Sequence, residues 1–208
     1  MGKQWTEMTL SKRLLDLIFG FCLSVLLLPV ISFTAIIILI IDGRPVFYIS
    51  ERMKTPDIGF NLLKFRTMKN SVRNSGVSGG DKVSRITRTG PFLRRTRLDE
   101  LPQLWNVLAG DMSFIGPRPP LRQYVERFPE IYEEVLKSRP GVSGLASIHF
   151  HAHEAYLLSG TTDAEQTDDV YTRRCIPRKY ELDIIYQENR SICFDLVLMF
   201  RTVFRRRR

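Results

Sequence analysis

Hydrophobic residues are concentrated near the start of the chain, where no charged residue occurs between Leu17 and Ile41 (LIFGFCLSVLLLPVISFTAIIILII). As an α-helix rising about 1.5 Å per residue, this 25-residue run is long enough to cross the hydrocarbon core of a bilayer. A cleaved signal peptide is a poor explanation, because the run is long and no small-residue cleavage site follows it. The pattern therefore predicts a membrane helix.

Pro29 lies near the middle of this helix, where it removes a backbone hydrogen bond and clashes with the preceding turn. Basic residues flank the helix on both sides: Lys3, Lys12 and Arg13 before it, Arg44, Arg52 and Lys54 after it. Positive flanks favour the cytoplasm, so this arrangement is satisfied best when both ends are cytoplasmic. Two topologies fit the pattern. One is a spanning helix kinked at Pro29; the other is a re-entrant helix over residues 14–42, with two arms of roughly 20 Å that enter one leaflet and return.

Shorter patterns after residue 44 predict an α/β (α+β) fold, with a compact, mainly helical domain and a few short strands. Residues 46–69 predict two strands around a turn at 56–59. Helical periods cover residues 98–108, about 121–136 and about 179–189. The first of these helices holds Pro102 in its first turn, which places Asp99 and Glu100 at its N-terminal end.

The segment from residue 70 to residue 90 is rich in Ser, Gly, Thr and Arg and predicts a mobile loop. The loop is either a simple linker or a flap that orders over a phosphate. Neither a GxGxxG nor a P-loop pattern occurs in it, so it carries no nucleotide-binding fingerprint.

The chain ends on an apolar stripe, SICFDLVLMFRTVFRRRR, with five arginines among the last eight residues. This stripe predicts a helix that either packs on the core or lies at a membrane interface. The membrane helix near the start favours the interfacial alternative, in which Arg205–Arg208 contact anionic headgroups.

Composition adds charge to this picture. The 208 residues suit a single core of ordinary size, and 31 Lys and Arg against 22 Asp and Glu give a net charge of +9. Such a balance suits a polyanionic partner: nucleic acid, an anionic membrane surface or a phosphorylated substrate. Three cysteines without metal-type spacing indicate a reduced, cytosolic setting.

Candidate chemistry lies in residues 88–120, RTGPFLRRTRLDELPQLWNVLAGDMSFIGPRPP, where Asp99 and Glu100 are surrounded by arginines. Composition alone favours an ordinary helix whose acidic first turn complements its own dipole. The alternative is a phosphate-transfer site, in which arginines and a helix N-terminus hold phosphates while a carboxylate attacks phosphorus or binds Mg²⁺.

A resemblance decides between these interpretations. The block at 86–119 closely resembles the signature of the bacterial sugar transferase family, the monotopic phosphoglycosyl transferases that act on polyprenyl phosphate. The similarity extends over nearly the whole chain. It includes KRLLDLIFG (12–20), the proline-broken apolar helix, ISERMK (49–54), KFRTM (64–68), RPGVSGLASI (139–148) and YELDIIYQENRSICFDLVLMFRTV (180–203).

The resemblance implies a ping-pong reaction that moves a phosphosugar from a UDP-sugar to polyprenyl phosphate and releases UMP, beginning membrane glycan assembly. Asp99 matches the family's nucleophile and Glu100 its acidic neighbour, and the pair is where the usual cofactor, Mg²⁺, would bind. Lys64, Arg66, Arg94 and Arg118 match basic positions expected to face phosphates. Because Asp99 lies at a helix N-terminus among cations, we also expect its pKa to be lowered.

Pro29 matches the break in the family's re-entrant membrane helix, which favours that topology on the cytosolic face of the bacterial inner membrane. Residues 1–43 would then form the membrane region and residues 44–208 the catalytic domain. The family's long members carry further transmembrane helices and another domain, so this chain resembles the minimal form. The shared motifs specify neither the sugar, the glycan pathway nor the oligomeric state.

The chain departs from the family at HFHAH, where His151 replaces an expected arginine. If this segment is a strand, His149, His151 and His153 share one face, and a Zn²⁺ site, a substrate contact by His151 or a plain polar edge would each fit. An alternative for the whole chain is a non-catalytic, membrane-tethered module that binds anionic lipid or nucleic acid. The acidic pair at the centre of the arginines would repel a nucleic-acid backbone, so no nucleic-acid partner is expected.

Overall fold

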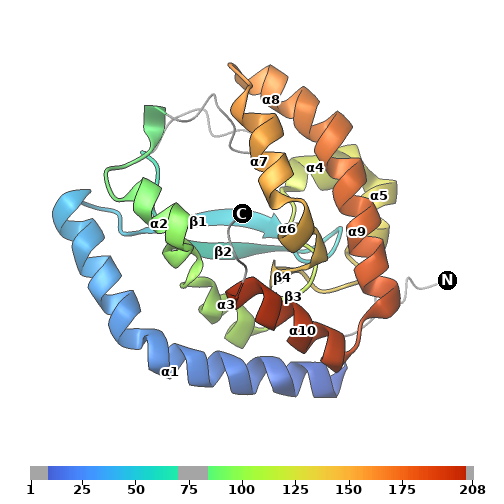
Figure 1. Cartoon of the computed structure of the whole chain (residues 1–208), viewed down its shortest axis with the longest axis horizontal. Coiled ribbons are helices and arrows are strands. Elements are labelled where there is room, and N and C mark those ends of the chain that lie inside the picture. Colours follow the sequence, from blue (N-terminus) through green and yellow to red (C-terminus); the bar gives the residue numbers. More distant parts are fainter. Residues whose placement is uncertain (1–8, 70–83, 205–208) are drawn as a thin grey trace.

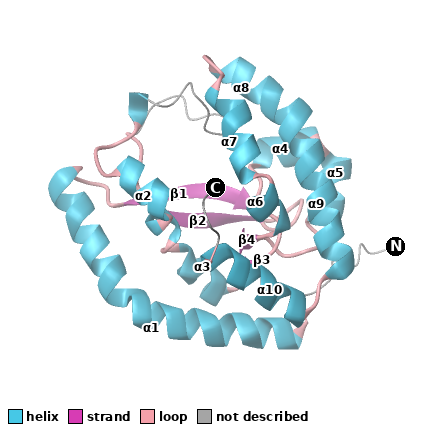
Figure 2. Cartoon of the chain, in the orientation of Figure 1, coloured by secondary structure: helices cyan, strands magenta, loops and turns pink. Residues whose placement is uncertain are grey.

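The computed structural model describes residues 9–69 and 84–204; most of the predicted loop and Arg205–Arg208 lie outside this part of the chain. Helices dominate, and the strands form two small sheets of two strands each (Figure 1 and Figure 2). The mixed, mainly helical fold predicted from the sequence is confirmed. The α-helices are α1 (Leu10–Ile41), α2 (Gly90–Thr96), α3 (Gln103–Ala109), α4 (Arg122–Arg127), α5 (Pro129–Val135), α6 (Leu145–His149), α7 (His151–Ser159), α8 (Ala164–Val170), α9 (Ile176–Asn189) and α10 (Ile192–Val203). The strands are β1 (Phe47–Met53), β2 (Gly59–Phe65), β3 (Ser113–Ile115) and β4 (Gly141–Ser143), and the short turns are the 3₁₀ turn η2 (Leu98–Glu100) and the π-helical turn η3 (Tyr171–Cys175).

The long apolar segment forms helix α1, which changes direction partway along its length (Figure 1). Pro29 lies inside the helix, and the Thr34 hydroxyl donates to the Val30 carbonyl at 2.7 Å. A proline and a back-bonded threonine both favour a bend. Within the described residues, α1 is the one helix long and apolar enough to cross a membrane, and most of its apolar side chains are exposed.

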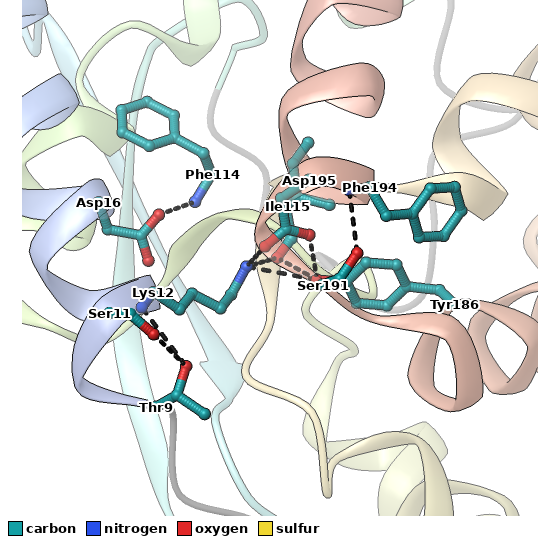
Figure 3. A network of polar contacts seen from close by, with 10 residues as sticks. All are labelled: Thr9, Ser11, Lys12, Asp16, Phe114, Ile115, Tyr186, Ser191, Phe194 and Asp195. Atoms are coloured by element: carbon teal, nitrogen blue, oxygen red, sulfur yellow. Dashed lines mark hydrogen bonds and ion pairs between the residues drawn. The ribbon is translucent and has the colours of Figure 1, made fainter.

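A polar network fastens the start of α1 to the rest of the molecule (Figure 3). The Lys12 ammonium donates to the Ile115 carbonyl at 3.1 Å and forms an ion pair with Asp195 of α10. The Tyr186 hydroxyl of α9 donates to the other carboxylate oxygen of Asp195 at 2.8 Å. The buried Asp16 accepts a hydrogen bond from the Phe114 amide at 3.2 Å. Elements distant in sequence are thereby held against one end of α1.

The hairpin predicted over residues 46–69 is confirmed, with β1 and β2 antiparallel and Phe47 paired with Phe65. Helix α3 attaches to β2 through the buried Asn106. Its side-chain amide donates to the Asn61 carbonyl at 2.8 Å, and its oxygen accepts from the Leu63 amide at 3.0 Å. Because η2 directly precedes α3, this attachment also places the acidic pair beside the hairpin.

Three of the predicted helices differ in detail from the structure. The helix expected over residues 98–108 is divided into η2 and α3, with Pro102 as the residue before α3. The helix expected over about 121–136 is two helices, because Pro129 starts α5 and cannot continue α4. The helix expected at 179–189 begins earlier, at Ile176.

The C-terminal apolar stripe forms α10, in which some apolar side chains are buried and others are exposed. Leu198 is fully buried in a cluster with Ile115 and Tyr186, whereas Phe200 and Val203 are exposed. The helix therefore packs on the core along one side and presents an apolar surface along the other.

Candidate active site

A cavity of about 660 Å³ lies between the hairpin, η2 and helices α5, α7 and α9. That volume is within the range of small-molecule sites. Six of the residues expected at the site from the sequence line it: Lys64, Arg94, Asp99, Glu100, Arg118 and, from α7, His151. The structure thus brings together side chains that are up to 87 positions apart (151 − 64) in the sequence.

The acidic pair is placed by an unusual backbone conformation. Arg97 has a φ of 63°, in the left-handed region that non-glycine residues seldom adopt, and it ends α2. The chain then turns into η2, whose second and third residues are Asp99 and Glu100. Such conformations are costly and occur often at functional sites.

Arg118 is placed by a close approach of two backbone segments. It follows Gly116, where a Cβ atom would lie 2.1 Å from the Arg139 carbonyl oxygen. The Gly141 amide donates to the Pro117 carbonyl at 2.8 Å and holds the two segments together. Glycine at position 116 is therefore required for Arg118 to reach the acidic pair.

Glu100 is held by cations on both of its oxygens. Its Oε1 lies 2.9 Å from Arg118 Nη2 and 3.0 Å from Lys64 Nζ, and its Oε2 lies 3.6 Å from Arg97 Nη1. Burial opposes ionisation, but these three cations outweigh it and hold the pKa of Glu100 well below its usual range. Glu100 is thus a fixed negative charge that orients the surrounding cations.

Asp99 differs from Glu100 both in its hydrogen bonding and in the direction of its pKa shift. Its side chain is buried, and its Oδ1 has no hydrogen-bond partner among the described residues. Burial raises the pKa of Asp99; Lys64 opposes the shift and Glu100 adds to it. The expectation that cations and a helix terminus lower this pKa is therefore wrong, because desolvation outweighs them. A poorly solvated carboxylate oxygen without a partner is suited to react with, or ligate, an incoming group.

The other predicted basic residues have different surroundings. Arg94 lines the cavity and donates to the Thr67 hydroxyl at 3.0 Å. Arg66 does not line this cavity. Its guanidinium donates to the carbonyls of residues 42, 43 and 44 at 2.6, 2.8 and 3.0 Å, which holds the turn that follows α1.

The histidine segment is helical, so the predicted strand is wrong. Leu145, Ala146, Phe150 and Leu158 are buried at helical spacing, and this period prevails over the short alternation of HFHAH. His151 lines the main cavity, whereas His149 and His153 line a separate hollow beside Arg174. No group of three potential ligands from His, Cys, Asp and Glu occurs in the described part of the chain, which gives a three-histidine metal site no support.

The oxygens of the acidic pair allow the fit of Mg²⁺ to be judged. Mg²⁺ is commonly bound by one or two carboxylates together with substrate phosphates and water. Oδ1 of Asp99 is an available oxygen of this kind, whereas Glu100 is engaged by three cations. Asp99 therefore fits Mg²⁺ as a carboxylate ligand that phosphate oxygens would complete, and Glu100 could join it only by giving up part of its contact with the cations.

Sequence reasoning missed the part of the cavity lining that α7 and α9 form. Helix α9 contributes Lys179 and Asp183, and α7 contributes Glu154. Residues 151, 154 and 158 of α7 and residues 176, 179, 180 and 183 of α9 line the cavity at intervals of three and four, which is one face of each helix. In the sequence, the signal for this part of the cavity was the occurrence of polar residues on an otherwise apolar face of each helix.

Comparisons with known proteins identify the family. The model described as bacterial sugar transferase matches residues 7–207, and the chain belongs to this family. A UDP-N-acetylgalactosamine-undecaprenyl-phosphate N-acetylgalactosaminephosphotransferase of Aeromonas hydrophila is 33% identical over 198 residues, which are 92% of this chain and 42% of that protein. An uncharacterized sugar transferase of Bacillus subtilis (strain 168), EpsL, is 33% identical over 192 residues, 92% of this chain and 85% of that protein. A UDP-glucose:undecaprenyl-phosphate glucose-1-phosphate transferase of Escherichia coli (strain K12) is 32% identical over 200 residues, 94% of this chain and 40% of that protein. The chain thus spans less than half the length of two of these relatives and most of the third.

Proposed function

We propose that this chain transfers a phosphosugar from a UDP-sugar to polyprenyl phosphate and releases UMP. The observation that carries the proposal is the partnerless Oδ1 of Asp99, buried in a cavity lined by Lys64, Arg94, Arg97 and Arg118. A diphosphate brings negative charge that this set of cations can balance. The names of the two characterised relatives describe transfer of different sugar phosphates to the same lipid, which supports the reaction class without selecting a sugar.

In the first step, Oδ1 of Asp99 attacks the β-phosphorus and the bond from that phosphorus to the UMP oxygen breaks. UMP leaves with the bonding electrons, and a phosphosugar-aspartate forms. In the second step, a phosphate oxygen of the polyprenyl phosphate attacks the same phosphorus and Asp99 leaves as a carboxylate. Neither step requires a proton from the protein, and covalent catalysis divides one transfer into two in-line displacements.

The residues around Asp99 have separate parts in this scheme. Arg118 and Lys64 would exchange part of their contact with Glu100 for phosphate oxygens, and Arg94 would add charge from the α2 side. Mg²⁺, held by Asp99 and Glu100 with phosphate oxygens, would neutralise phosphate charge when bound. His151 lines the cavity and would contact the substrate in place of the arginine expected there.

The acceptor is a lipid, so the site must open toward a membrane. Exposed apolar side chains occur on several helices: Phe33 on α1, Phe92 on α2, Trp105 on α3 and Phe200 on α10. We propose that α1 is re-entrant and that both of its ends face the cytosol at the inner membrane. Cysteine labelling from outside intact cells should then miss residue 5 and residue 60; labelling of residue 5 alone would establish a spanning helix.

Intact-protein mass spectrometry tests the mechanism. The protein is incubated with a UDP-sugar and Mg²⁺ without acceptor, and we expect a mass gain of one phosphosugar on Asp99. Asp99→Asn should abolish both the adduct and UMP release while still binding UDP-sugar, and Glu100→Gln should slow both severely. Turnover that requires both substrates together, with no adduct under any quench, would instead establish direct transfer.

A further inference from the structure

Four polar side chains that line the cavity have no part in the proposed transfer of the phosphosugar. They are Glu154 of α7, Tyr171 of η3, and Lys179 and Asp183 of α9, here called the polar wall. Arg118 lines the same cavity, and Glu154 as well as Glu100 and Asp99 raises the pKa of its guanidinium. The polar wall therefore faces the same space into which Asp99 opens.

The centre of the polar wall is a buried ion pair. The Lys179 ammonium lies 3.0 Å from Glu154 Oε1 and donates to the Tyr171 hydroxyl at 3.2 Å. The Lys179 and Glu154 side chains are only 16% and 17% exposed. Buried ion pairs contribute little net stability compared with apolar residues of the same size. An ion pair that lines a cavity is better explained by a ligand.

The chemistry of the polar wall matches a sugar ring. Each sugar hydroxyl is both a donor and an acceptor, and two carboxyl groups, an ammonium and a phenol offer both partners. Asp183 adds a group that burial keeps protonated in part near neutrality, since burial raises its pKa to about 7 against the opposing charge of Lys179. A uracil ring offers one N–H donor and two carbonyls on a flat edge, which leaves most of these groups without a partner.

We infer that the polar wall binds the sugar of the nucleotide sugar and determines which sugar the enzyme accepts. The inference rests on the proposed function for the position of the sugar, which is attached to the phosphorus that Asp99 attacks. A site built to hydrogen-bond a substrate hydroxyl rejects analogues in which that hydroxyl is missing or turned away, because its own buried groups then lose their partners.

Two conservative variants and one control test the inference. Glu154→Gln keeps the shape of the side chain and removes its charge, and Tyr171→Phe removes one hydroxyl while keeping the ring that packs on Tyr124. Glu181→Gln is the control, since Glu181 lies exposed on α9 and pairs with Arg178. UMP release is measured for a panel of UDP-hexoses and UDP-N-acetylhexosamines, together with inhibition by UMP.

For both variants we expect the ratio of kcat/KM between the best sugar and the next to fall by roughly tenfold to a hundredfold. Inhibition by UMP should change less than twofold, and Glu181→Gln should match the wild type. An equal loss for every sugar, an unchanged ratio, or weakened UMP inhibition would each overturn the inference; the last result would assign the polar wall to the nucleotide.

Calorimetric binding of the same UDP-sugars separates this inference from the proposed function. Wild-type protein that releases no UMP, yet binds different UDP-sugars with affinities that Glu154→Gln equalises, would refute the transferase and support the polar wall. If the wild type releases UMP and the Glu154→Gln variant keeps the same sugar preference, the transferase is supported and the role of the polar wall is refuted. Absence of both UMP release and sugar-dependent binding would overturn both.

Discussion

Asp183 offers a quantitative test of how strongly the interior of the cavity excludes water. The residue is buried, and burial raises its pKa from 3.8 to about 7, against the opposing charge of Lys179. A carboxyl whose folded pKa lies above its unfolded value binds more protons in the folded state between those two values. Its cost to stability is therefore absent below pH 3.8, grows as the pH rises, and is complete above pH 7.

The magnitude follows from the two pKa values. The full shift, from 3.8 to about 7, corresponds to about 4 kcal/mol at roughly 1.4 kcal/mol per unit. Two of those units lie between pH 5 and pH 7, so about 3 kcal/mol of the cost develops between pH 5 and pH 8. Asp183→Asn resembles the protonated carboxyl and removes this cost. Relative to the wild type, the variant should gain about 3 kcal/mol between pH 5 and pH 8, or roughly 6–12 °C in Tm.

The assay is thermal unfolding of both proteins in the same detergent at half-unit steps of pH, read as the difference between their Tm values. Using the difference cancels the titration of every group that the two proteins share. Glu181→Gln, exposed on the same helix, supplies the control and should show a flat difference. A flat difference for Asp183→Asn as well would mean that Asp183 is hydrated, and the desolvation argument would be wrong.

Three further predictions concern residues outside the polar wall. Arg66→Lys should lower the free energy of unfolding by about 2–3 kcal/mol, since the turn after α1 loses hydrogen bonds from the guanidinium, and should leave the KM for UDP-sugar unchanged. A raised KM at unchanged Tm would instead support the phosphate contact expected from the family resemblance. Lys12→Met should lower the free energy of unfolding by about 3–5 kcal/mol, because Asp195 is left buried without its cation. Adding Asp195→Asn should recover part of this loss in thermal unfolding, and equal losses for the single and double variants would contradict the prediction. Trp105→Ser should weaken binding to liposomes roughly tenfold at unchanged Tm, because the ring is 69% exposed and would lie in the interface; unchanged sedimentation with liposomes would place Trp105 away from the membrane.

Local patterns in the sequence predicted most of the elements. The hairpin, the apolar helix and α10 follow from short-range alternation and helical period, which depend on neighbouring residues alone. The division at Pro129 could have been predicted from the same rule that was applied to Pro102. The strand interpretation of the histidine segment was wrong, because five alternating residues are too few to outweigh a helical period that extends on either side.

The site was predicted less completely, because its electrostatics depend on burial. Asp99 and Glu100 are adjacent in the sequence, yet one has a raised pKa and the other a lowered pKa. Three cations reach Glu100, and nothing in the sequence indicated that the pKa values of the two carboxylates would shift in opposite directions. Arg66 matched a family position but turned toward α1, and the cavity-lining face of α9 was interpreted only as a helix. These assignments needed contacts between residues far apart in the chain.

The buried stripe of α1 has a consequence for how this helix tolerates substitution. Asp16, Gly20, Thr34 and Ile38 are its buried residues, and 34 and 38 lie 18 residues, five full turns, after 16 and 20. They must fit protein atoms; a Cβ on Gly20, for example, would lie 3.0 Å from Leu108. Most of the other apolar side chains of α1 are exposed, and in the bilayer that we propose for this helix one apolar side chain is nearly equivalent to another. A saturation library across α1 should therefore show a helical rhythm of intolerant sites within a segment whose hydrophobicity is almost uniform.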